Sequence, residues 1–239
     1  MTTKISTILK TNPFFRNFTA DSIETIASKA HIINFPKNHI VFLNEDPASC
    51  FYVTLNGWIK LFRETVDGAQ SIVDIVTKNQ IFGETAIFQN DVHNFSAEVI
   101  EDTKVILLPL ALLKSEIEKN TKVAMDMMSS LARYRKQQDQ EIENRTLKNA
   151  SQRIGCFLLR LIDQNKTGDI IVNLPYDKTL VASRLGMQPE TFSRALNKLK
   201  DHIAMDVKGS AIHIHNIRDL IDYACMACSS EFPCNDMNV

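Results

Sequence analysis

The sequence lacks the apolar stretches that mark a secreted or membrane-spanning chain. Its opening segment, MTTKISTILKTNPFF, is too polar for a signal-peptide core, and no later segment approaches the roughly 20 apolar residues of a membrane span. There are only five cysteines, an odd count, and three of them fall near the C-terminal end, which does not fit a disulfide framework. We therefore expect a cytoplasmic protein without membrane contacts, whose cysteines are reduced or bind metal.

A large charge of one sign is also missing. The 27 Lys and Arg residues are balanced by 28 Asp and Glu residues, so the formal net charge is −1. Such a chain does not coat nucleic acid, and any DNA binding must be local. The sequence contains no P-loop, G-x-S-x-G, H-E-x-x-H or dinucleotide fingerprint. We therefore expect that this protein is not an enzyme.

Between Ile32 and Leu110 the sequence consists of short apolar runs separated by turn residues. Their spacing of roughly 8–12 residues predicts strands of a sandwich, barrel or jelly roll. Asp67-Gly68 is a strong signal for a hairpin turn. Helix-capping patterns are absent from this stretch, which also favours an all-β domain.

A helical pattern follows Pro109, and the only glycine between residues 112 and 164 is Gly155. The pattern predicts long helices, one of them from Val123 to Leu147. Apolar residues form a stripe along this helix, interrupted by Gln138. The stripe consists of Val123, Met127, Leu131, Tyr134 and Ile142. Its spacing fits a helix packed against a partner subunit, and equally an amphipathic helix packed on its own domain.

The segment from residue 176 to 205 carries start and stop signals for two short helices. Asp177 can cap a first helix that runs through Leu185, and Gly186 can end it in the left-handed conformation. Pro189 then takes the first position of a second helix, where its missing N–H costs nothing. Two short helices joined by a glycine-containing turn form a helix-turn-helix.

The second helix has an apolar face and a polar face. The apolar face consists of Phe192, Ala195, Leu196 and Leu199, and the polar face of Glu190, Ser193, Arg194 and Asn197. Arginine can bond guanine, a carboxylate can accept from cytosine, and serine serves either role. We expect Glu190, Ser193 and Arg194 to read bases in the major groove. A surface ion pair would explain Glu190 and Arg194, but not the whole arrangement.

Residues around this helix can hold the DNA backbone. We expect that role for Lys178, Thr179, Gln188, Thr191, Asn197 and Lys198. Seven basic and four acidic residues between 176 and 218 give a local positive excess, which suits phosphate contacts. Residues 205–207 and 211–214, joined around Gly209, read as the hairpin of a wing. Its His213 and His215 are expected to face solvent or phosphate.

This order of elements resembles the CRP/FNR superfamily of transcription regulators over nearly the whole chain. Gly57, Asp67-Gly68 and the run from Gly83 to Phe88 match the β-roll pattern of that superfamily. The organisation is α+β: a cyclic-nucleotide-binding-like β jelly roll, a long dimerisation helix, a winged helix-turn-helix and a cysteine-containing tail. The expected bounds of these four parts are residues 1–120, 121–148, 149–224 and 225–239.

The resemblance is closest to the FNR branch. Glu190, Ser193 and Arg194 match its E-x-x-S-R signature, and QPETFSRAL is similar to DNR- and HcpR-type members that respond to nitric oxide. Pro189 stands where CRP-type members have arginine. The resemblance implies a homodimer on an inverted TTGAT-type repeat, with RNA polymerase as partner. It also implies a signal of oxygen or nitric oxide, sensed through an iron–sulfur or haem centre.

Cyclic AMP is not expected as the ligand. Members that bind it carry an Arg-Ser pair after G-E-x-x-x-x, whose guanidinium holds the cyclic phosphate. Here the corresponding stretch is His93-Asn94-Phe95-Ser96-Ala97, and no arginine lies between Arg63 and Arg133. We therefore expect Gly83 and Glu84 to have a structural role and no role in binding a ligand. The alternatives to a gas or redox regulator are a module that responds to a small ligand without metal, and a module whose helical tail contacts protein rather than DNA.

The tail offers soft metal ligands. Cys225 and Cys228 lie three residues apart at the end of a helix that Asn216 can cap, and Cys234 follows Pro233. Three thiolates suit an iron–sulfur cluster or zinc, and the fourth ligand could be Cys50, Cys156, a carboxylate or a group from the other subunit. A C-terminal cluster of this kind resembles the Bacillus-type FNR. The alternative is a frayed tail with unligated thiols.

Haem is the other sensor chemistry that the resemblance implies. Neutral imidazole is a good iron ligand, and the histidines of the expected sensor domain are His31, His39 and His93. None of them lies in a motif, and a lone histidine is more often an ordinary surface or core residue than an axial ligand. Each of the three is a candidate on chemistry alone.

Overall fold

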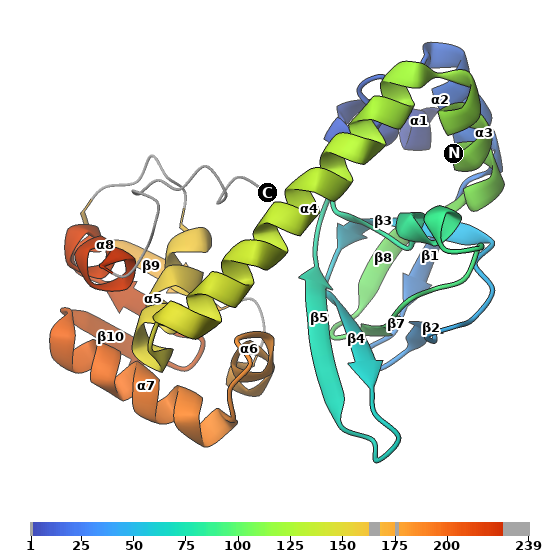
Figure 1. Ribbon diagram of the computed structural model, residues 1–239. Coiled ribbons are helices and arrows are strands. Elements are labelled where there is room, and N and C mark those ends of the chain that lie inside the picture. Colours follow the sequence, from blue (N-terminus) through green and yellow to red (C-terminus); the bar gives the residue numbers. More distant parts are fainter. Residues whose placement is uncertain (1, 163–167, 175–176, 227–239) are drawn as a thin grey trace. The chain divides into compact units, whose positions relative to one another are not determined.

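The computed structural model describes residues 2–162, 168–174 and 177–226 (Figure 1). The chain divides into two compact units, Met1–Leu131 and Ala132–Val239. The first unit is a β-roll with short helices, and the second is mostly helical with a small sheet. The α+β class, the jelly roll, the long helix and the C-terminal helix-turn-helix expected from the sequence are confirmed.

Two short helices that we did not expect precede the first strand. Helices α1 (Thr2–Thr11) and α2 (Ala20–Lys29) flank the 3-10 helix η1 (Pro13–Phe15). The side chain of Asn12 accepts a hydrogen bond from the backbone N–H of Phe14, and that of Thr19 accepts one from Ser22. Their buried apolar residues pack against the roll.

The roll consists of two antiparallel four-stranded sheets. The first has the order β1 (His31–Phe35), β8 (Thr103–Pro109), β3 (Cys50–Asn56) and β6 (Ile81–Phe82). The second has the order β2 (Ile40–Phe42), β7 (Ser96–Val99), β4 (Ile59–Glu64) and β5 (Gln70–Val76). Both orders place strands distant in sequence side by side, which is typical of a jelly roll.

Strand alternation divides the apolar residues of the first sheet between two cores. Tyr52 and Val105 face the second sheet and pack with Phe42 and Phe82. Their neighbours Val53 and Ile106 face the other way and pack with α1, α2 and the helix that follows β8. Because both faces of this sheet are covered, its central strands β3 and β8 are the most deeply buried.

Glycines shape the turns that were predicted in the roll. Gly68 has φ +83° in the β4–β5 connection, as expected from Asp67-Gly68. At Gly57 φ is +81°, and an added Cβ would collide with Oγ1 of Thr103. That hydroxyl instead accepts a hydrogen bond from the backbone N–H of Trp58, which closes the corner between β3 and β4.

The run from Gly83 to Phe88 corrects one expectation, because this stretch contains helix where only strands were predicted. Ile81–Phe82 is a two-residue strand, and Glu84–Phe88 forms the 3-10 helix η2. Gly83 has φ +83° and breaks the strand direction at this point.

Helix α3 (Leu110–Lys119) leads into the 27-residue helix α4 (Thr121–Leu147), close to the expected bounds. The apolar stripe of α4 is divided. Val123 and Met127 are buried in the first unit, whereas Leu131 and Ile142 are 38% and 64% exposed. In the described parts of the chain no helix is long and apolar enough to cross a bilayer.

The second unit encloses a core of its own. It contains α5 (Ala150–Arg160), β9 (Ile170–Asn173), α6 (Lys178–Arg184), α7 (Pro189–His202), β10 (Met205–Lys208), β11 (Ala211–Ile214) and α8 (Ile217–Cys225). The strands form an antiparallel sheet of order β10-β11-β9. Gly155 lets α5 and α8 approach closely, since an added Cβ would lie 2.9 Å from Cβ of Ala224.

Candidate nucleic-acid interface

Helix α6 and the turn after it are built by the residues expected to cap them. A side-chain oxygen of Asp177 accepts a hydrogen bond from the backbone N–H of Leu180 at 2.9 Å. Gly186 has φ +63°, and the N–H of Met187 donates to the carbonyl of Ala182 at 3.0 Å. Pro189 is the first residue of α7. The local signals therefore produce a helix-turn-helix.

Helix α7 separates its two faces as the spacing predicts. The inward side chains are 0–7% exposed: Phe192, Ala195, Leu196 and Leu199. Glu190, Ser193 and Arg194 are exposed in its first two turns. Within the described residues no ion pair joins Glu190 to Arg194, so the ion-pair explanation for these two residues is not realised here. The outward face thus presents a carboxylate, a hydroxyl and a guanidinium to solvent.

Most of the expected backbone-binding residues are also exposed. Lys178 and Thr179 lie in the first turn of α6, and Gln188 is the N-cap residue of α7. Asn197 and Lys198 are exposed further along α7, whereas Thr191 is only partly exposed. Donors and positive charges therefore flank the polar face of α7 along both helices.

Polar contacts from α5 hold the two helices of the motif in place. The hydroxyl of Ser151 on α5 donates to the carbonyl of Ala195 at 2.9 Å, in a fully buried contact. Arg153 donates to the carbonyl of Leu185, at the end of α6, at 3.2 Å. Asn149 and Gln152 form a capping box that starts α5 at the right place for these contacts. Side-chain hydrogen bonds from α5 thus reach both helices of the motif.

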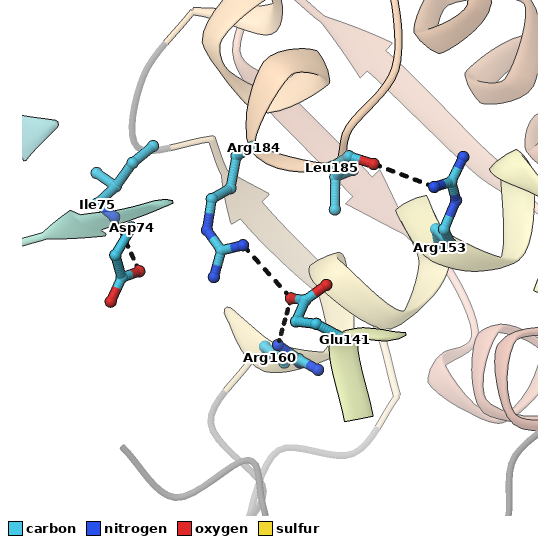
Figure 2. A network of polar contacts seen from close by, with 7 residues as sticks. All are labelled: Asp74, Ile75, Glu141, Arg153, Arg160, Arg184 and Leu185. Carbon is cyan, nitrogen blue, oxygen red and sulfur yellow. Dashed lines mark hydrogen bonds and ion pairs between the residues drawn. The ribbon is translucent and has the colours of Figure 1, made fainter. Parts of the chain in front are cut away.

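An acidic residue of α4 ties this long helix to the helix-turn-helix. Figure 2 shows Glu141 between two arginines, and each N–O distance is 3.4 Å. Arg160 belongs to α5 and Arg184 to α6, and the Glu141 side chain is 25% exposed. This contact was not expected, because the partners are far apart in sequence. It places the end of α4 against the first helix of the motif.

The predicted wing is present as the β10–β11 hairpin, with Gly209 at φ +61° in its turn. His213 and His215 do lie on its solvent side, but they are not simply solvated. Both contact the carboxylate of Asp169, at 2.9 and 3.2 Å. Asp169 was not among the expected site residues.

Only part of the expected cysteine cluster can be placed. Asn216 accepts a hydrogen bond from the N–H of Arg218 and caps α8, as predicted. Cys225 is the last residue of α8 and is half-buried. Cys228 and Cys234 lie outside the described residues. Cys50 and Cys156, considered as a fourth ligand, are half-buried in different units.

The three histidines considered for haem occupy different environments. His31 and His39 are exposed, and His39 stacks on Phe35 with ring centroids 4.7 Å apart. His93 is 4% exposed and lies flat on Phe42 at 3.6 Å. Burial lowers the pKa of His93, and the charge of Asp46 only partly offsets this effect. His93 is therefore a neutral core histidine.

Residues 93–97 correspond to the stretch that holds the cyclic phosphate in cyclic-nucleotide binders. In this chain they make contacts within the protein. Ser96 is buried, and its hydroxyl accepts a hydrogen bond from the N–H of Asn44 at 3.0 Å. Arg63, the nearest arginine in sequence, donates from Nε to the carbonyl of Asn94 at 2.9 Å. Neither side chain reproduces the Arg-Ser pair.

Comparison with known proteins identifies both units. Residues 32–120 match the model of the cyclic nucleotide-binding domain, and residues 152–223 match the Crp-like helix-turn-helix domain. A solved structure from Ruegeria pomeroyi, described as a cyclic nucleotide binding protein, is 30% identical. The alignment covers 92% of this chain and 96% of that one, with a TM-score of 0.65.

Two curated relatives are regulators, and their names refer to different signals. The CRP-like cAMP-activated global transcriptional regulator of Mycobacterium tuberculosis is 23% identical over 192 residues, which cover 79% of this chain and 86% of that protein. The Anaerobic regulatory protein of Pasteurella multocida is 23% identical over 205 residues, which cover 84% and 74%. With both domains matched in the same order, the chain belongs to the CRP/FNR family of transcription regulators, whose members are DNA-binding proteins and not enzymes.

Proposed function

We propose that the protein binds, as a homodimer, an inverted repeat of TTGAT-like half-sites, and that Glu190, Ser193 and Arg194 of each subunit read the bases. The observation that supports this most is the division of α7. Its apolar face is packed to 0–7% exposure, while these three side chains stand exposed at its N-terminal end. Recognition helices contact base edges from that end.

The backbone contacts of the proposed complex come from both helices of the motif. Lys178, Thr179, Gln188, Thr191, Asn197 and Lys198 are the side chains that we assign to phosphates. Such contacts set the register of α7 on the duplex and carry no sequence information themselves. RNA polymerase is the proposed protein partner, since the family regulates transcription.

The direct test is binding to a labelled duplex that carries the inverted TTGAT repeat. We expect a retarded complex in a gel shift, weakened when one half-site is scrambled, because a two-fold dimer needs both halves. The measurement is made under aerobic and anaerobic conditions, with a fully scrambled duplex as control. The absence of any sequence-specific shift under both conditions would contradict the proposal.

Dimerisation is assigned to the exposed apolar side of α4. Met128 is 63% exposed and Ile142 64%, and Leu131 lies between them on the same helix. Large apolar side chains in a row on a solvated helix are typical of a surface that packs against a second helix.

Replacing Leu131 with glutamate should separate the subunits. A charge placed in an apolar helix–helix contact cannot keep its hydration, so we expect the dimer dissociation constant to rise by about tenfold or more. Sedimentation equilibrium measures this constant. Ser129→Glu adds the same charge on another face of α4 and should leave the dimer intact. Equal dissociation of both variants would exclude this face as the interface.

We propose that a redox or gas signal, oxygen or nitric oxide, gates DNA binding through an iron–sulfur or haem centre. Support for the cluster comes from the donor set: Cys225 ends α8, and two further cysteines follow within the next nine residues. Such a cluster would supply sensitivity to oxidation. The Pasteurella relative, an anaerobic regulatory protein by name, supports a signal of this kind. For haem the candidate axial ligands are His31 and His39, which are exposed, and His93, which is buried.

The alternative signal is a small ligand bound by the β-roll without metal. It is favoured by the match of residues 32–120 to the cyclic nucleotide-binding domain and by the cAMP-activated Mycobacterium relative. Cyclic AMP itself is disfavoured. Ser96 accepts a hydrogen bond from Asn44, Arg63 donates to Asn94, and no arginine lies between Arg63 and Arg133 to hold a cyclic phosphate.

A visible absorption spectrum of protein purified without oxygen separates these signals. A broad brown shoulder that is lost in a Cys225→Ser variant would support the cluster, and a Soret band would support haem. A colourless protein that still binds DNA fully would contradict both the iron–sulfur cluster and the haem. The small ligand bound without metal would then be the remaining signal.

A further inference from the structure

The small sheet of the second unit carries an unusual group of side chains on its solvent face. Ile212 and Ile214 of β11 are 0% exposed and point into the core, so His213 and His215 point away from it. In the antiparallel pairing of β11 with β9, Ile214 lies opposite Ile170. His215 follows Ile214 and Asp169 precedes Ile170 in the sequence, and Nδ1 of His215 lies 3.2 Å from Oδ1 of Asp169. The register therefore brings residues separated by more than 40 positions into one cluster.

The distances within this cluster suit a shared ligand. Oδ1 of Asp169 lies 2.9 Å from Nε2 of His213 and 3.2 Å from Nδ1 of His215. One ligand atom from each of the three residues can be chosen so that all lie within 4.8 Å of one another. A tetrahedral zinc ion with bonds of about 2.1 Å separates its ligand atoms by about 3.4 Å. Two of the separations, 2.9 and 3.2 Å, lie near this value.

A second carboxylate supports one of the two imidazoles. Nε2 of His215 lies 3.1 Å from Oδ2 of Asp206, which is on β10. Metal-binding histidines usually donate their other N–H to a carboxylate, which sets the tautomer and orients the ring. With Nε2 engaged by Asp206, His215 presents Nδ1 to Asp169, the side on which an ion would be bound.

The electrostatics of the cluster also favour a cation. Two carboxylates face two imidazoles on an exposed surface. The hydrogen bond that the His215 ring donates to Asp206 is the main cause of a raised pKa at His215, and the same contact lowers the pKa of Asp206. The carboxylate of Asp169 lies beside both rings and that of Asp206 beside His215, so the cluster holds two negative charges around the place where a cation would be bound.

We propose that Asp169, His213 and His215 form a binding site for a divalent transition-metal ion of the zinc type, with Asp206 orienting His215. Two imidazoles and a carboxylate form a ligand set that suits Zn²⁺, and three protein ligands leave a further position for water. The site lies on the sheet that carries the wing. Its nitrogen and oxygen ligands differ from the thiolates of the C-terminal tail. It depends on neither the proposed half-site nor the proposed redox centre.

Zinc titration of the full-length protein tests the site. Because Cys225, Cys228 and Cys234 would also bind zinc, the titration uses a variant in which all three are serine. Isothermal calorimetry with ZnCl₂ at pH 7.5 should show one ion per chain. His213→Ala and His215→Ala should each weaken binding by at least about tenfold, and Asp206→Asn by about tenfold or more without removal of a ligand.

His202→Ala is the matched control, because this exposed histidine lies in the same unit and outside the cluster. It should bind zinc as tightly as the parent. Folding of each variant is checked by circular dichroism, and the imidazole resonances of His213 and His215 should shift on zinc addition. Equal zinc affinity in a His213→Ala, His215→Ala double variant, or no binding to the parent up to about 100-fold molar excess, would overturn the proposal.

Discussion

Replacing Glu84 with glutamine should stabilise the β-roll unit at pH 8 and have little effect near pH 4. Glu84 opens the 3-10 helix η2 after Gly83, and burial raises its pKa to about 7, although a hydrogen bond from its own backbone acts in the opposite direction. In the unfolded chain the ordinary value of about 4.5 applies. Between these values the folded protein binds more protons than the unfolded one, so the free energy of unfolding falls as pH rises.

The size of this effect follows from the shift. A difference of about 2.5 pKa units corresponds to about 3 kcal/mol. Glu84 as a residue is partly exposed, so this figure is an upper limit. Glutamine carries no charge to desolvate at any pH, and the loss of stability between pH 4.5 and 7 should therefore be smaller in Glu84→Gln than in the parent.

Urea unfolding followed by the fluorescence of Trp58 measures this difference, because the single tryptophan lies in the β-roll unit. His93, with its lowered pKa, changes stability in the opposite direction with pH, but it does so in both proteins and cancels in the comparison. Glu118→Gln, at an exposed glutamate of α3, is the control. A constant stability difference between Glu84→Gln and the parent from pH 4 to 8 would refute the assignment.

The second large effect is expected at Arg194. Its replacement by alanine should cost about 1–3 kcal/mol at the inverted TTGAT repeat, a factor of about 5–150 in affinity, and relax the preference at one base position. The side chain is exposed and its helix is packed through the opposite face, so the fold should not change. Fluorescence anisotropy with matched and scrambled duplexes measures both affinities.

Lys198→Ala provides the contrast, because a lost phosphate contact lowers affinity for every duplex and reduces the salt slope by about one. If Arg194→Ala weakens the matched and the scrambled duplex by the same factor, Arg194 contacts the backbone and does not read a base.

The helix-turn-helix was predictable in detail because its signals are local. Asp177, Gly186 and Pro189 each act within a few residues of their own position, and the inward face of α7 follows from spacing alone. The N-terminal helices carry comparable capping signals, with Asn12 before Pro13 and the cap at Thr19. These helices were not predicted, because capping residues in segments this short also occur in loops.

The features that escaped prediction depend on contacts between distant parts of the chain. Asp169 meets His213 and His215 only through the β9–β11 register, and Glu141 meets Arg184 only once the second unit is packed. The stripe on α4 gave no sign that Val123 and Met127 are covered by the first unit whereas Leu131 is exposed. Periodicity identifies a face of a helix, but tertiary structure decides what covers each part of it.

The ion pairs of Glu141 have a consequence for how DNA affinity is measured. Arg160 and Arg184 are held to α4 by charge at 3.4 Å, in a contact that solvent and ions can reach. Added salt weakens such pairs by screening, while it also opposes the release of counterions from DNA. A plot of log affinity against log salt concentration would then overcount the phosphates that the protein touches. In Glu141→Gln the two arginines have no carboxylate partner on α4, so no ion pair of this group is left for salt to screen, and the same plot would give the slope that belongs to the DNA contacts.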